Sequence, residues 1–324
     1  MKLNTSIALC TYNGEKYLQE QLDSLAKQTR LPDELVVCDD GSTDRTIEIL
    51  QTFAQTAPFH VRIEQNTANL GFVRNFEKCS RLCSGDVVFF CDQDDIWLPE
   101  KIDRFAEVFE TNPDVGMVLC DAQLIDSNGQ KLKSIYSQGI GNIHRLAAIA
   151  RKNSAQFVCQ TSVSSWAGMS MAFRNNCQEI LYPFPETNSH DAWVLQTIGA
   201  ISNIFIITQP LVRYRIHGGN QIGEENDTIA KQKKSAQSDK TVQMYRSISM
   251  NLSCIIEHLQ AQQRFPVKDS TLKLYQSKAE HCLIRYKIRT KQVNKWLYIL
   301  KETLNGNYFR FDRGILSIGM DVLS

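Results

Sequence analysis

The chain has 324 residues, 43% of them hydrophobic and 22% charged, which is an ordinary composition for a globular protein with a sizeable core. No apolar run approaches the roughly 18 residues that cross a membrane, and the N-terminus lacks the apolar segment of a signal peptide. The ten cysteines form no CxxC pair, so we expect free thiols and a cytoplasmic protein.

The net charge of +1 conceals an uneven distribution of charge along the chain. Residues 229–324 carry 17 Lys and Arg against 7 Asp and Glu, and the residues before them carry 19 against 28. An acidic body followed by a basic segment indicates an anionic partner. Such a partner is either a nucleic acid or an anionic membrane surface. We favour the membrane surface and expect no nucleic acid.

Short apolar runs alternate with amphipathic stretches over the N-terminal third of the chain. The apolar runs predict strands at residues 6–10, 34–38, 61–64, 87–91 and 116–120, with helices between them. This alternation predicts an α/β fold with a largely parallel central sheet and helices on both faces. Neither GxGxxG nor GxxxxGK[ST] follows the first strand, which argues against a dinucleotide-binding fold and a P-loop hydrolase.

The periodicity is weaker after Asp126. In this part we expect a helix at residues 143–150, strands at 169–173 and 204–207, and a helix that begins near Ser189.

Three carboxylates, Asp92, Asp94 and Asp95, follow the buried strand at residues 87–91. Clustered like charges repel one another unless something neutralises them. The Asp-x-Asp spacing sends two carboxylates to the same side of an extended chain, and such oxygen ligands favour Mg²⁺ or Mn²⁺. The alternative is that these acids cap the helix that follows Pro99, which fits Asp95 best.

Polar residues directly follow three of the predicted strands, at positions 11–13, 39–40 and 92–94. Sheets of this kind bind ligands beyond the carboxyl ends of their strands. We therefore expect the three polar stretches to converge on one crevice.

The chain contains, in this order, the segments CTYNGEKYL, VCDDGSTD, NLGFVRNF, CDQDDIWLPEKI, SHDAW and YRIHGGNQIG. In this combination the sequence resembles family 2 glycosyltransferases, and among them most closely the bacterial rhamnosyltransferase-like members that assemble surface polysaccharides. The resemblance covers residues 4–222. It implies a nucleotide-sugar-binding GT-A domain with a mixed, mostly parallel central sheet over residues 1–227. A basic, mainly helical C-terminal segment over residues 228–324 is left without a matching motif.

The resemblance also implies an inverting, metal-dependent transfer of a sugar such as rhamnose from a dTDP- or UDP-linked donor to a glycan or lipid-linked acceptor. Thr11 and Tyr12 would line the base pocket, Asp40 would bond the nucleobase, and Asp92 would face the ribose. The residues expected to act are Thr11, Tyr12, Asn13, Asp40, Arg74, Asp92 and Gln93 on the nucleotide sugar, Asp94 and His217 on the metal, Asp191 in catalysis, and Trp166, Gly168, His190 and Trp193 on the acceptor.

Transfer from a sugar diphosphate requires that the leaving diphosphate be neutralised and that the acceptor hydroxyl lose its proton. Asp94 with Mg²⁺ or Mn²⁺ would meet the first need, and Asp191 is the candidate base, with a helix cap as its alternative role. His217 would complete the metal shell or contact a phosphate, and Arg213 and Arg215 beside it carry charges suited to phosphates.

Other residues also have a structural alternative. Arg74 would reach the diphosphate or lie on a solvated helix face, and Trp166 and Trp193 would stack on sugars or fill the core. The alternative function is a non-catalytic nucleotide-sugar or glycan-binding protein, which predicts a broken acidic site. A nucleotidyltransferase would need a Gly-rich basic loop after the first strand, which residues 11–15 do not provide.

Lysines border an apolar stripe near the C-terminus. The lysines are Lys291, Lys295 and Lys301, and the stripe consists of Val293, Trp296, Leu297, Leu300 and Leu304. Two arrangements fit this pattern: a helix on the inner face of the cell membrane near a lipid-linked acceptor, or a helix that packs its stripe on the catalytic domain with the lysines in water.

Overall fold

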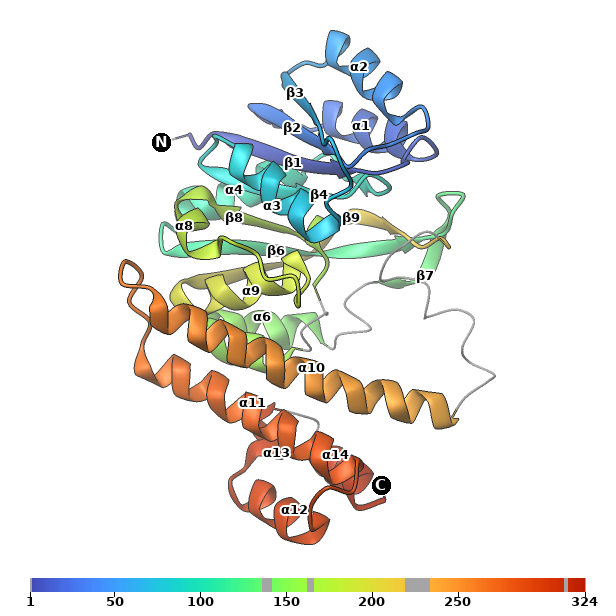
Figure 1. Cartoon of the computed structure of the whole chain (residues 1–324). Helices are drawn as coiled ribbons and strands as arrows, with labels where there is room; N and C mark the ends of the chain where they lie inside the picture. The colour runs from blue at the N-terminus through green and yellow to red at the C-terminus, as the bar shows by residue number, and fades with distance from the viewer. Residues whose placement is uncertain (1, 136–141, 162–165, 219–233, 312–313, 324) are drawn as a thin grey trace.

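The computed structural model describes residues 2–135, 142–161, 166–218, 234–311 and 314–323. A sheet with helices on both faces forms the larger part of the molecule, and a group of C-terminal helices extends from one end (Figure 1). The strands are β1 (Thr5–Thr11), β2 (Glu34–Asp39), β3 (His60–Gln65), β4 (Val87–Cys91), β5 (Ile96–Trp97), β6 (Val115–Ile125), β7 (Lys131–Ile135), β8 (Met171–Arg174) and β9 (Asn203–Arg215). The helices are α1 (Leu18–Ala26), α2 (Thr46–Thr56), α3 (Phe72–Leu82), α4 (Lys101–Thr111), α6 (Ile143–Lys152), α7 (Ser154–Gln160), α8 (Gln178–Leu181), α9 (His190–Ile201), α10 (Lys234–Ala261), α11 (Asp269–Arg289), α12 (Lys295–Leu304), α13 (Asn307–Phe311) and α14 (Ile315–Leu323), with 3₁₀ turns η1 (Gly168–Ser170) and η2 (Asn175–Cys177).

The sheet joins a parallel half to a mixed half. Its order is β3-β2-β1-β4-β8-β6-β9-β5, with β7 paired to β6. Strands β3, β2, β1 and β4 run parallel, β8 is antiparallel to both β4 and β6, and β9 is parallel to β6. The predicted α/β fold with a mixed sheet is confirmed. The second half is less parallel than predicted, because the short strands β5, β7 and β8 all pair antiparallel.

Alternate side chains of the parallel strands face two apolar layers, as the two-residue period of a strand requires. In β1, Ile7 and Leu9 pack with α1, α2 and α4, whereas Ala8 and Cys10 pack with α3. Both layers exclude water from the middle of the strands, so the polar groups of this half lie at the strand ends. Thr5 and Ser6 bond Asp33 and Glu34 at the amino ends, and Thr11 bonds Asp39 at the carboxyl ends.

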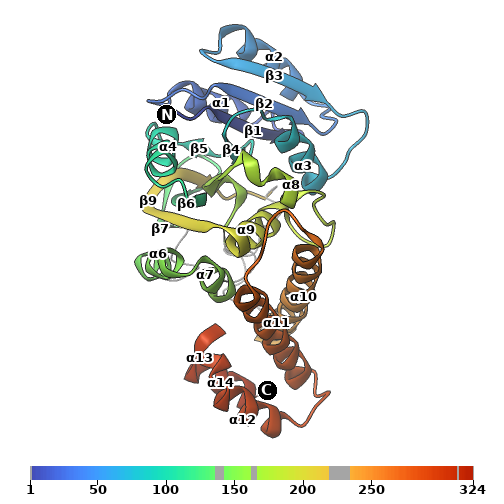
Figure 2. The ribbon, with the colours of Figure 1, turned by 90° about the vertical axis from the view of Figure 1, so that its left-hand side faces the viewer.

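Helices α10 and α11 pack side by side and extend the apolar layer that contains α3 and α9 (Figure 2). Tyr275 of α11 belongs to the same buried cluster as Phe76 and Trp193, and its hydroxyl donates to the Gln196 carbonyl of α9 over 2.8 Å. The predicted domain boundary at residue 227 falls outside the described residues and stays a prediction. Within the described part of the chain, no helix combines the length and apolar character that a membrane span requires.

Buried charged side chains hold the terminal helices on α11. Arg285 donates to both carboxylate oxygens of Asp321 over 2.8 and 2.9 Å, and Arg289 donates to the same carboxylate over 2.9 Å. The Tyr308 hydroxyl adds a fourth bond to Asp321 over 2.8 Å. Arg285 and Asp321 are fully buried, so each charge depends on the other for its neutralisation.

We predict that Asp321→Ala lowers the free energy of unfolding by about 3–5 kcal/mol, because two guanidinium groups lose their buried counter-charge. Chemical denaturation followed by circular dichroism measures this change. Glu280→Ala, an exposed acid on α11, is the matched control and should change stability by less than about 0.5 kcal/mol. Equal effects of the two substitutions would contradict the prediction.

Candidate active site

The predicted crevice begins where β1 and β2 end side by side. The strand register places Thr11 opposite Asp39, and the Thr11 hydroxyl donates to that buried carboxylate over 2.8 Å. Asp39 also accepts bonds from the Ser42 hydroxyl and backbone N–H. Thr11 and Asp39 therefore fix the two loops that follow the strands, and the Thr11 hydroxyl is already engaged.

Asp40 anchors the loop that leads into α3. Its carboxylate is 4% exposed and accepts bonds from Asn66 Nδ2 over 2.7 Å, from the Leu70 N–H over 2.8 Å and from the Gly71 N–H over 2.9 Å. A carboxylate has about four lone-pair positions, so these bonds leave capacity for one further donor. The arrangement is compatible with the nucleobase contact expected for Asp40, which stays a prediction.

A side-chain amide joins the first loop to the acidic loop. Gln93 Nε2 donates to the Tyr12 carbonyl over 3.0 Å, and Gln93 Oε1 accepts from the Tyr12 N–H over 2.9 Å. A Cβ atom at Gly14 would lie 2.3 Å from Gln93 Oε1, so a larger residue here would displace the Gln93 amide from Tyr12. The paired amide holds the backbone of Tyr12 against the acidic loop, and the Tyr12 side chain is half exposed. Asn13 has a positive φ of 48° and accepts a bond from the Thr43 N–H.

The acidic loop after β4 concentrates negative charge. Burial, together with the neighbouring Asp94 and Asp191, raises the pKa of Asp92 to about 7. Asp95 is fully buried, and burial together with Asp94 and Asp92 raises the pKa of its carboxyl well above the ordinary value. Asp191 comes from α9, far along the chain, so its effect on Asp92 shows that two distant motifs meet here.

Lys101, at the start of α4, lies buried beneath these acids. Its Nζ donates to the Met169 carbonyl over 2.6 Å and lies 3.3 Å from the centre of the Trp97 ring. Burial lowers the pKa of Lys101 to about 8, and the carboxylates of Asp95 and Asp92 oppose that shift. Sequence reasoning did not identify Lys101, because the first turn of an amphipathic helix is normally a solvated position for lysine.

Asp94 and His217 meet as the metal prediction requires. Asp94 Oδ2 lies 2.8 Å from His217 Nε2, and each side chain is 15% exposed. This separation is close to the roughly 3 Å between adjacent ligands of an octahedral Mg²⁺ site with bonds near 2.1 Å. The described residues contain no cluster of three His, Cys, Asp or Glu side chains suited to a metal. Two protein ligands still fit Mg²⁺ or Mn²⁺ when phosphates complete the shell.

Arg215 holds the acidic loop against β9. Its backbone N–H donates to Asp95 Oδ1 over 3.0 Å, and its Nε donates to the Asp94 carbonyl over 2.8 Å. A third bond, 2.6 Å long, joins its guanidinium to Glu20 of α1. Two expectations are corrected here. Arg215 is 1% exposed and turned inward, so it does not reach a phosphate, and Asp95 binds β9 instead of capping α4, which begins at Lys101.

Asp191 lies in the first turn of α9 and is 5% exposed. Its Oδ1 accepts a bond from the Ala192 N–H over 2.7 Å at the start of the helix. The same carboxylate lies close enough to Asp92 to raise its pKa, so Asp191 has both a helix-terminal contact and a place beside the acidic loop. The preceding residue, His190, stacks on Phe76 with ring centres 3.9 Å apart, and burial lowers its pKa to about 4. Neither ring nitrogen of His190 has a hydrogen-bond partner among the described residues.

Gly168 provides the space that His190 occupies. A Cβ atom at Gly168 would lie 2.9 Å from His190 Nε2 and 3.6 Å from Phe90 Cβ. The structure therefore brings Gly168 and His190 together beside Asp191, and their expected contact with an acceptor stays a prediction.

Arg74 lies on α3 in two ion pairs. It donates to Glu77 over 2.9 Å and to Glu186 over 3.3 Å, and its side chain is 38% exposed. The hydrogen bond that Arg74 donates to Glu77 is the main cause that raises the pKa of Arg74. Its guanidinium is thus neutralised by protein carboxylates, and contact with the diphosphate stays a prediction.

The two predicted acceptor tryptophans are core residues, which corrects that expectation. Trp166 is 1% exposed and Trp193 is 2% exposed, and both belong to the apolar cluster on the α3 side of the sheet. The Trp193 indole N–H donates to the Leu181 carbonyl over 2.7 Å. A sugar cannot stack on rings that the protein already covers, so neither residue forms an acceptor platform.

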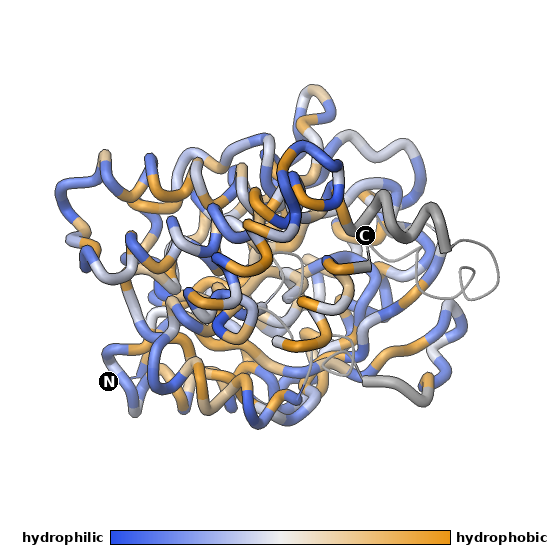
Figure 3. The backbone as a smooth tube through the Cα atoms, turned by 90° about the horizontal axis from the view of Figure 1, so that it is seen from below, coloured by the Kyte–Doolittle hydropathy of each residue, from blue (hydrophilic) through white to orange (hydrophobic). Residues whose placement is uncertain are grey.

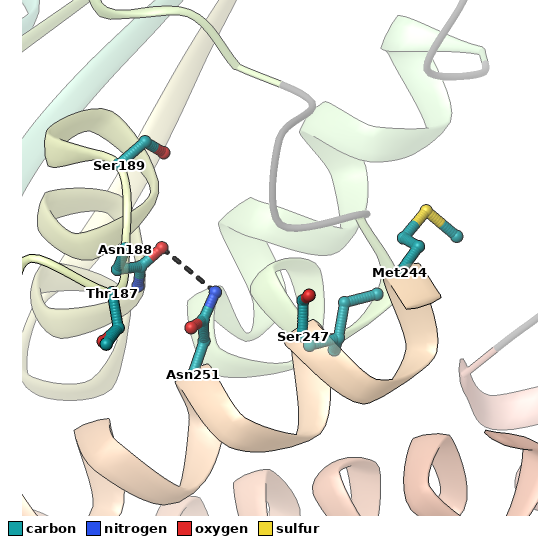
Figure 4. A pocket seen from close by; sticks show the side chains of 7 residues that line it. Thr187, Asn188, Ser189, Met244, Ser247 and Asn251 are labelled. Carbon is teal, nitrogen blue, oxygen red and sulfur yellow. Dashed lines mark hydrogen bonds between the residues drawn. The ribbon is translucent and has the colours of Figure 1, made fainter. Parts of the chain in front are cut away.

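A shallow pocket lies at the N-terminus of α9, between the loop before this helix and α10 (Figure 4). Thr187, Asn188 and Ser189 line one side, and Met244 and Asn251 line the other. Asn251 Nδ2 donates to Asn188 Oδ1 over 3.2 Å. Sequence reasoning missed this pocket because α10 lies in the segment that matched no motif.

Two solved structures of glycosyltransferases with the GT-A fold are similar to this chain. S. aureus TarS in complex with UDP matches with a TM-score of 0.56 and 17% identity, over 88% of this chain and 72% of that one. A mannosyltransferase from Pyrobaculum calidifontis in complex with GDP-Man and Mn²⁺ matches with a TM-score of 0.54 and 16% identity, over 99% and 85%. These likenesses show the GT-A fold.

Curated relatives are similar in sequence. An uncharacterized glycosyltransferase of Nostoc sp. is 28% identical over 73% of this chain and 72% of its own length. The dTDP-rhamnosyl transferase RfbG of Shigella flexneri is 26% identical over 70% of this chain and 77% of its own length. The sequence model of glycosyl transferase family 2 matches residues 6–180, which include the ends of β1, β2 and β4. The chain belongs to family 2 of the glycosyltransferases.

Proposed function

We propose that this protein transfers a sugar, with inversion, from a dTDP- or UDP-linked donor to a glycan or lipid-linked acceptor in surface polysaccharide synthesis. The observation that carries the proposal is the convergence of Asp92 and Asp94, after β4, with Asp191 of α9 and His217 after β9. These residues come from the two halves of the sheet, and a fold without this chemistry has no reason to gather there more acids than Lys101 and Arg215 compensate.

The donor side of the site is built from the first two loops and the acidic loop. Asp40 has remaining capacity to accept a bond from a nucleobase, and the Tyr12 backbone is held against the acidic loop by Gln93. Thr11 and Asn13 support these loops through their bonds to Asp39 and Thr43. The names of the relatives support a nucleoside-diphosphate sugar, and RfbG supports dTDP-rhamnose as the first donor to test.

A divalent cation would be held by Asp94 and His217. When bound, Mg²⁺ or Mn²⁺ supplies positive charge that stabilises the leaving diphosphate. Asp94, in the loop after β4, points toward His217, and Arg215 fixes the loop that carries Asp94. The structural neighbour with GDP-Man and Mn²⁺ supports this assignment.

Asp191 is the proposed base. Its carboxylate is positioned by the rigid first turn of α9 and by the Ala192 N–H, so it would take the proton of an acceptor hydroxyl without rearranging. The pocket beside Ser189 provides polar side chains next to this helix end and is a suitable location for part of the acceptor. Because inversion proceeds by direct displacement, this scheme needs only one such base.

The overall proposal is tested by measuring nucleotide release from a panel of dTDP-, UDP- and GDP-linked sugars with Mg²⁺, Mn²⁺ or EDTA. Release that depends on both a sugar acceptor and a divalent cation is expected. Nucleotide binding without any release across the panel would favour a non-catalytic binding protein.

The metal role predicts that Asp94→Ala abolishes the metal-dependent rise in melting temperature that UDP or dTDP produces. Transfer should fall at least about 100-fold, because the diphosphate loses several kcal/mol of charge stabilisation. Asp23 is an exposed acid on α1, and Asp23→Ala serves as the control. This variant should keep both the metal-dependent rise in melting temperature and the transfer activity. Undiminished transfer by folded Asp94→Ala in the presence of chelator would rule the role out.

The base role predicts that Asp191→Asn binds donor normally but transfers sugar about 10²–10⁴-fold more slowly. Asparagine keeps a side-chain oxygen for the Ala192 N–H, so the helix start is preserved while the base is lost. Single-turnover kinetics and donor titration separate the two effects. Weaker donor binding with an unchanged chemical step would instead make Asp191 a binding residue.

The positioning role of Arg215 predicts that Arg215→Lys raises the Mn²⁺ concentration needed for the nucleotide-induced melting shift by about 10–100-fold. Lysine keeps the charge but lacks the planar guanidinium that reaches the Asp94 carbonyl and Glu20 from two separate nitrogens. Arg213→Lys, two residues earlier on β9, is the matched control. Glu20→Gln removes one partner alone and should give a smaller shift in the same direction. An unchanged metal requirement in both Arg215→Lys and Glu20→Gln would refute the role.

A further inference from the structure

Helix α12 is oriented with its apolar side outward. Trp296, Leu297, Leu300 and Leu304 are between 57% and 77% exposed, whereas Glu302 is 2% exposed. In a helix that only packs on its own protein, the apolar stripe faces the core and the acid faces water. The structure therefore contradicts the arrangement in which this stripe packs on the catalytic domain.

Helix α14 repeats the same reversal independently. Ile315, Leu316 and Met320 are between 46% and 74% exposed, whereas Ser317 and Asp321 are buried. Phe309 of α13 is also exposed. We refer to the exposed side chains of these three helices as the outer apolar face, which consists of Trp296, Leu297, Leu300, Leu304, Phe309, Ile315, Leu316 and Met320. Figure 3, which views the molecule from this end, shows hydrophobic turns beside the C-terminus.

Ion pairs on the inner side fix this orientation. Glu302 Oε2 lies 2.5 Å from His281 Nδ1 of α11, and Asp321 bonds Arg285 and Arg289 of the same helix. Rotating α12 or α14 to bury the apolar residues would strip these charges of their partners. The outer apolar face is thus a defined surface of the fold.

The charges around the outer apolar face have one sign. Lys291, Lys301 and Arg310 are exposed, and among the described residues from 291 onward Glu302 and Asp321 are the only acids. Both acids are buried in the ion pairs described above. Among the described residues of this segment, apolar side chains and cations therefore reach the solvent while both acids stay buried.

We propose that the outer apolar face binds an anionic lipid membrane, with α12 and α14 lying in the interface. Apolar side chains that include a tryptophan, bordered by lysine and arginine, are the features of an interfacial amphipathic helix. These helices are too short to span a bilayer, which suits an orientation in its plane. A second copy of the chain is a poorer occupant, because the exposed Lys291, Lys301 and Arg310 of one copy would repel those of another.

The test is co-sedimentation of the full-length protein with vesicles of phosphatidylcholine alone or with added phosphatidylglycerol, at low and high salt. We expect binding that needs phosphatidylglycerol and weakens with salt. Leu300→Glu and Leu316→Glu, on separate helices, should each reduce binding at least tenfold. Gln in place of Lys291, Lys301 or Arg310 should reduce binding about fivefold for each charge.

Matched controls use equivalent residues elsewhere. Met250→Glu on α10 replaces another exposed apolar side chain, and Lys27→Gln removes an exposed lysine beside α1; both should bind like the unmodified protein. Circular dichroism melting checks that every variant is folded. Light scattering supplies the competing outcome: a dimer in solution that Leu300→Glu converts to monomers would overturn the proposal. Failure of the unmodified protein to bind anionic vesicles, or equal binding by Leu300→Glu and Met250→Glu, would overturn it as well.

Discussion

Negative charge gathered at the end of one buried strand is the constraint on which the rest of the catalytic half depends. Asp92, Asp94 and Asp95 leave β4 in close succession, and such charges are unfavourable in a poorly solvated place unless cations or hydrogen bonds compensate them. The protein supplies Lys101 from below and Arg215 from the side, both removed from water. The residual negative charge of this cluster attracts a cation, and under the proposed function that cation would in turn hold the diphosphate.

This compensation also explains why β9 is so long. The strand runs along β6 from Asn203, just after α9, to Arg215, which contacts the acidic loop. Its last residue contacts both the Asp94 carbonyl and Glu20 of α1, and His217 follows two residues later. Asp94, His217 and Glu20 of α1 are therefore joined through Arg215 and the end of β9 into one bonded unit. A displacement of β9 would move His217 and the backbone of Asp94 together.

Local sequence patterns were sufficient for the regular part of the fold and insufficient wherever burial depends on distant partners. The apolar run at residues 87–91 and its acids predicted both β4 and the carboxylates beyond it, because strand and site are adjacent in sequence. The roles of Lys101 and Arg215 could not be predicted, since a charged residue indicates a solvated position until the fold provides a buried partner for it. Trp166 and Trp193 fit sugar stacking and core packing equally well from sequence, and only their exposure decides between these roles.

In the C-terminal helices, too, buried charged groups depend on one another, and here the consequence is that apolar residues remain on the surface. A buried ion cluster such as the one around Asp321 is seldom the most stable way to fill a core, because apolar side chains of similar volume do equally well or better. Its effect is on orientation. Polar groups that must face α11 leave the apolar residues of α12 and α14 only the outward direction, so the helices cannot gain stability by turning over. Stability is thus spent on keeping an apolar surface available, which is a physical reason to assign that surface a binding function.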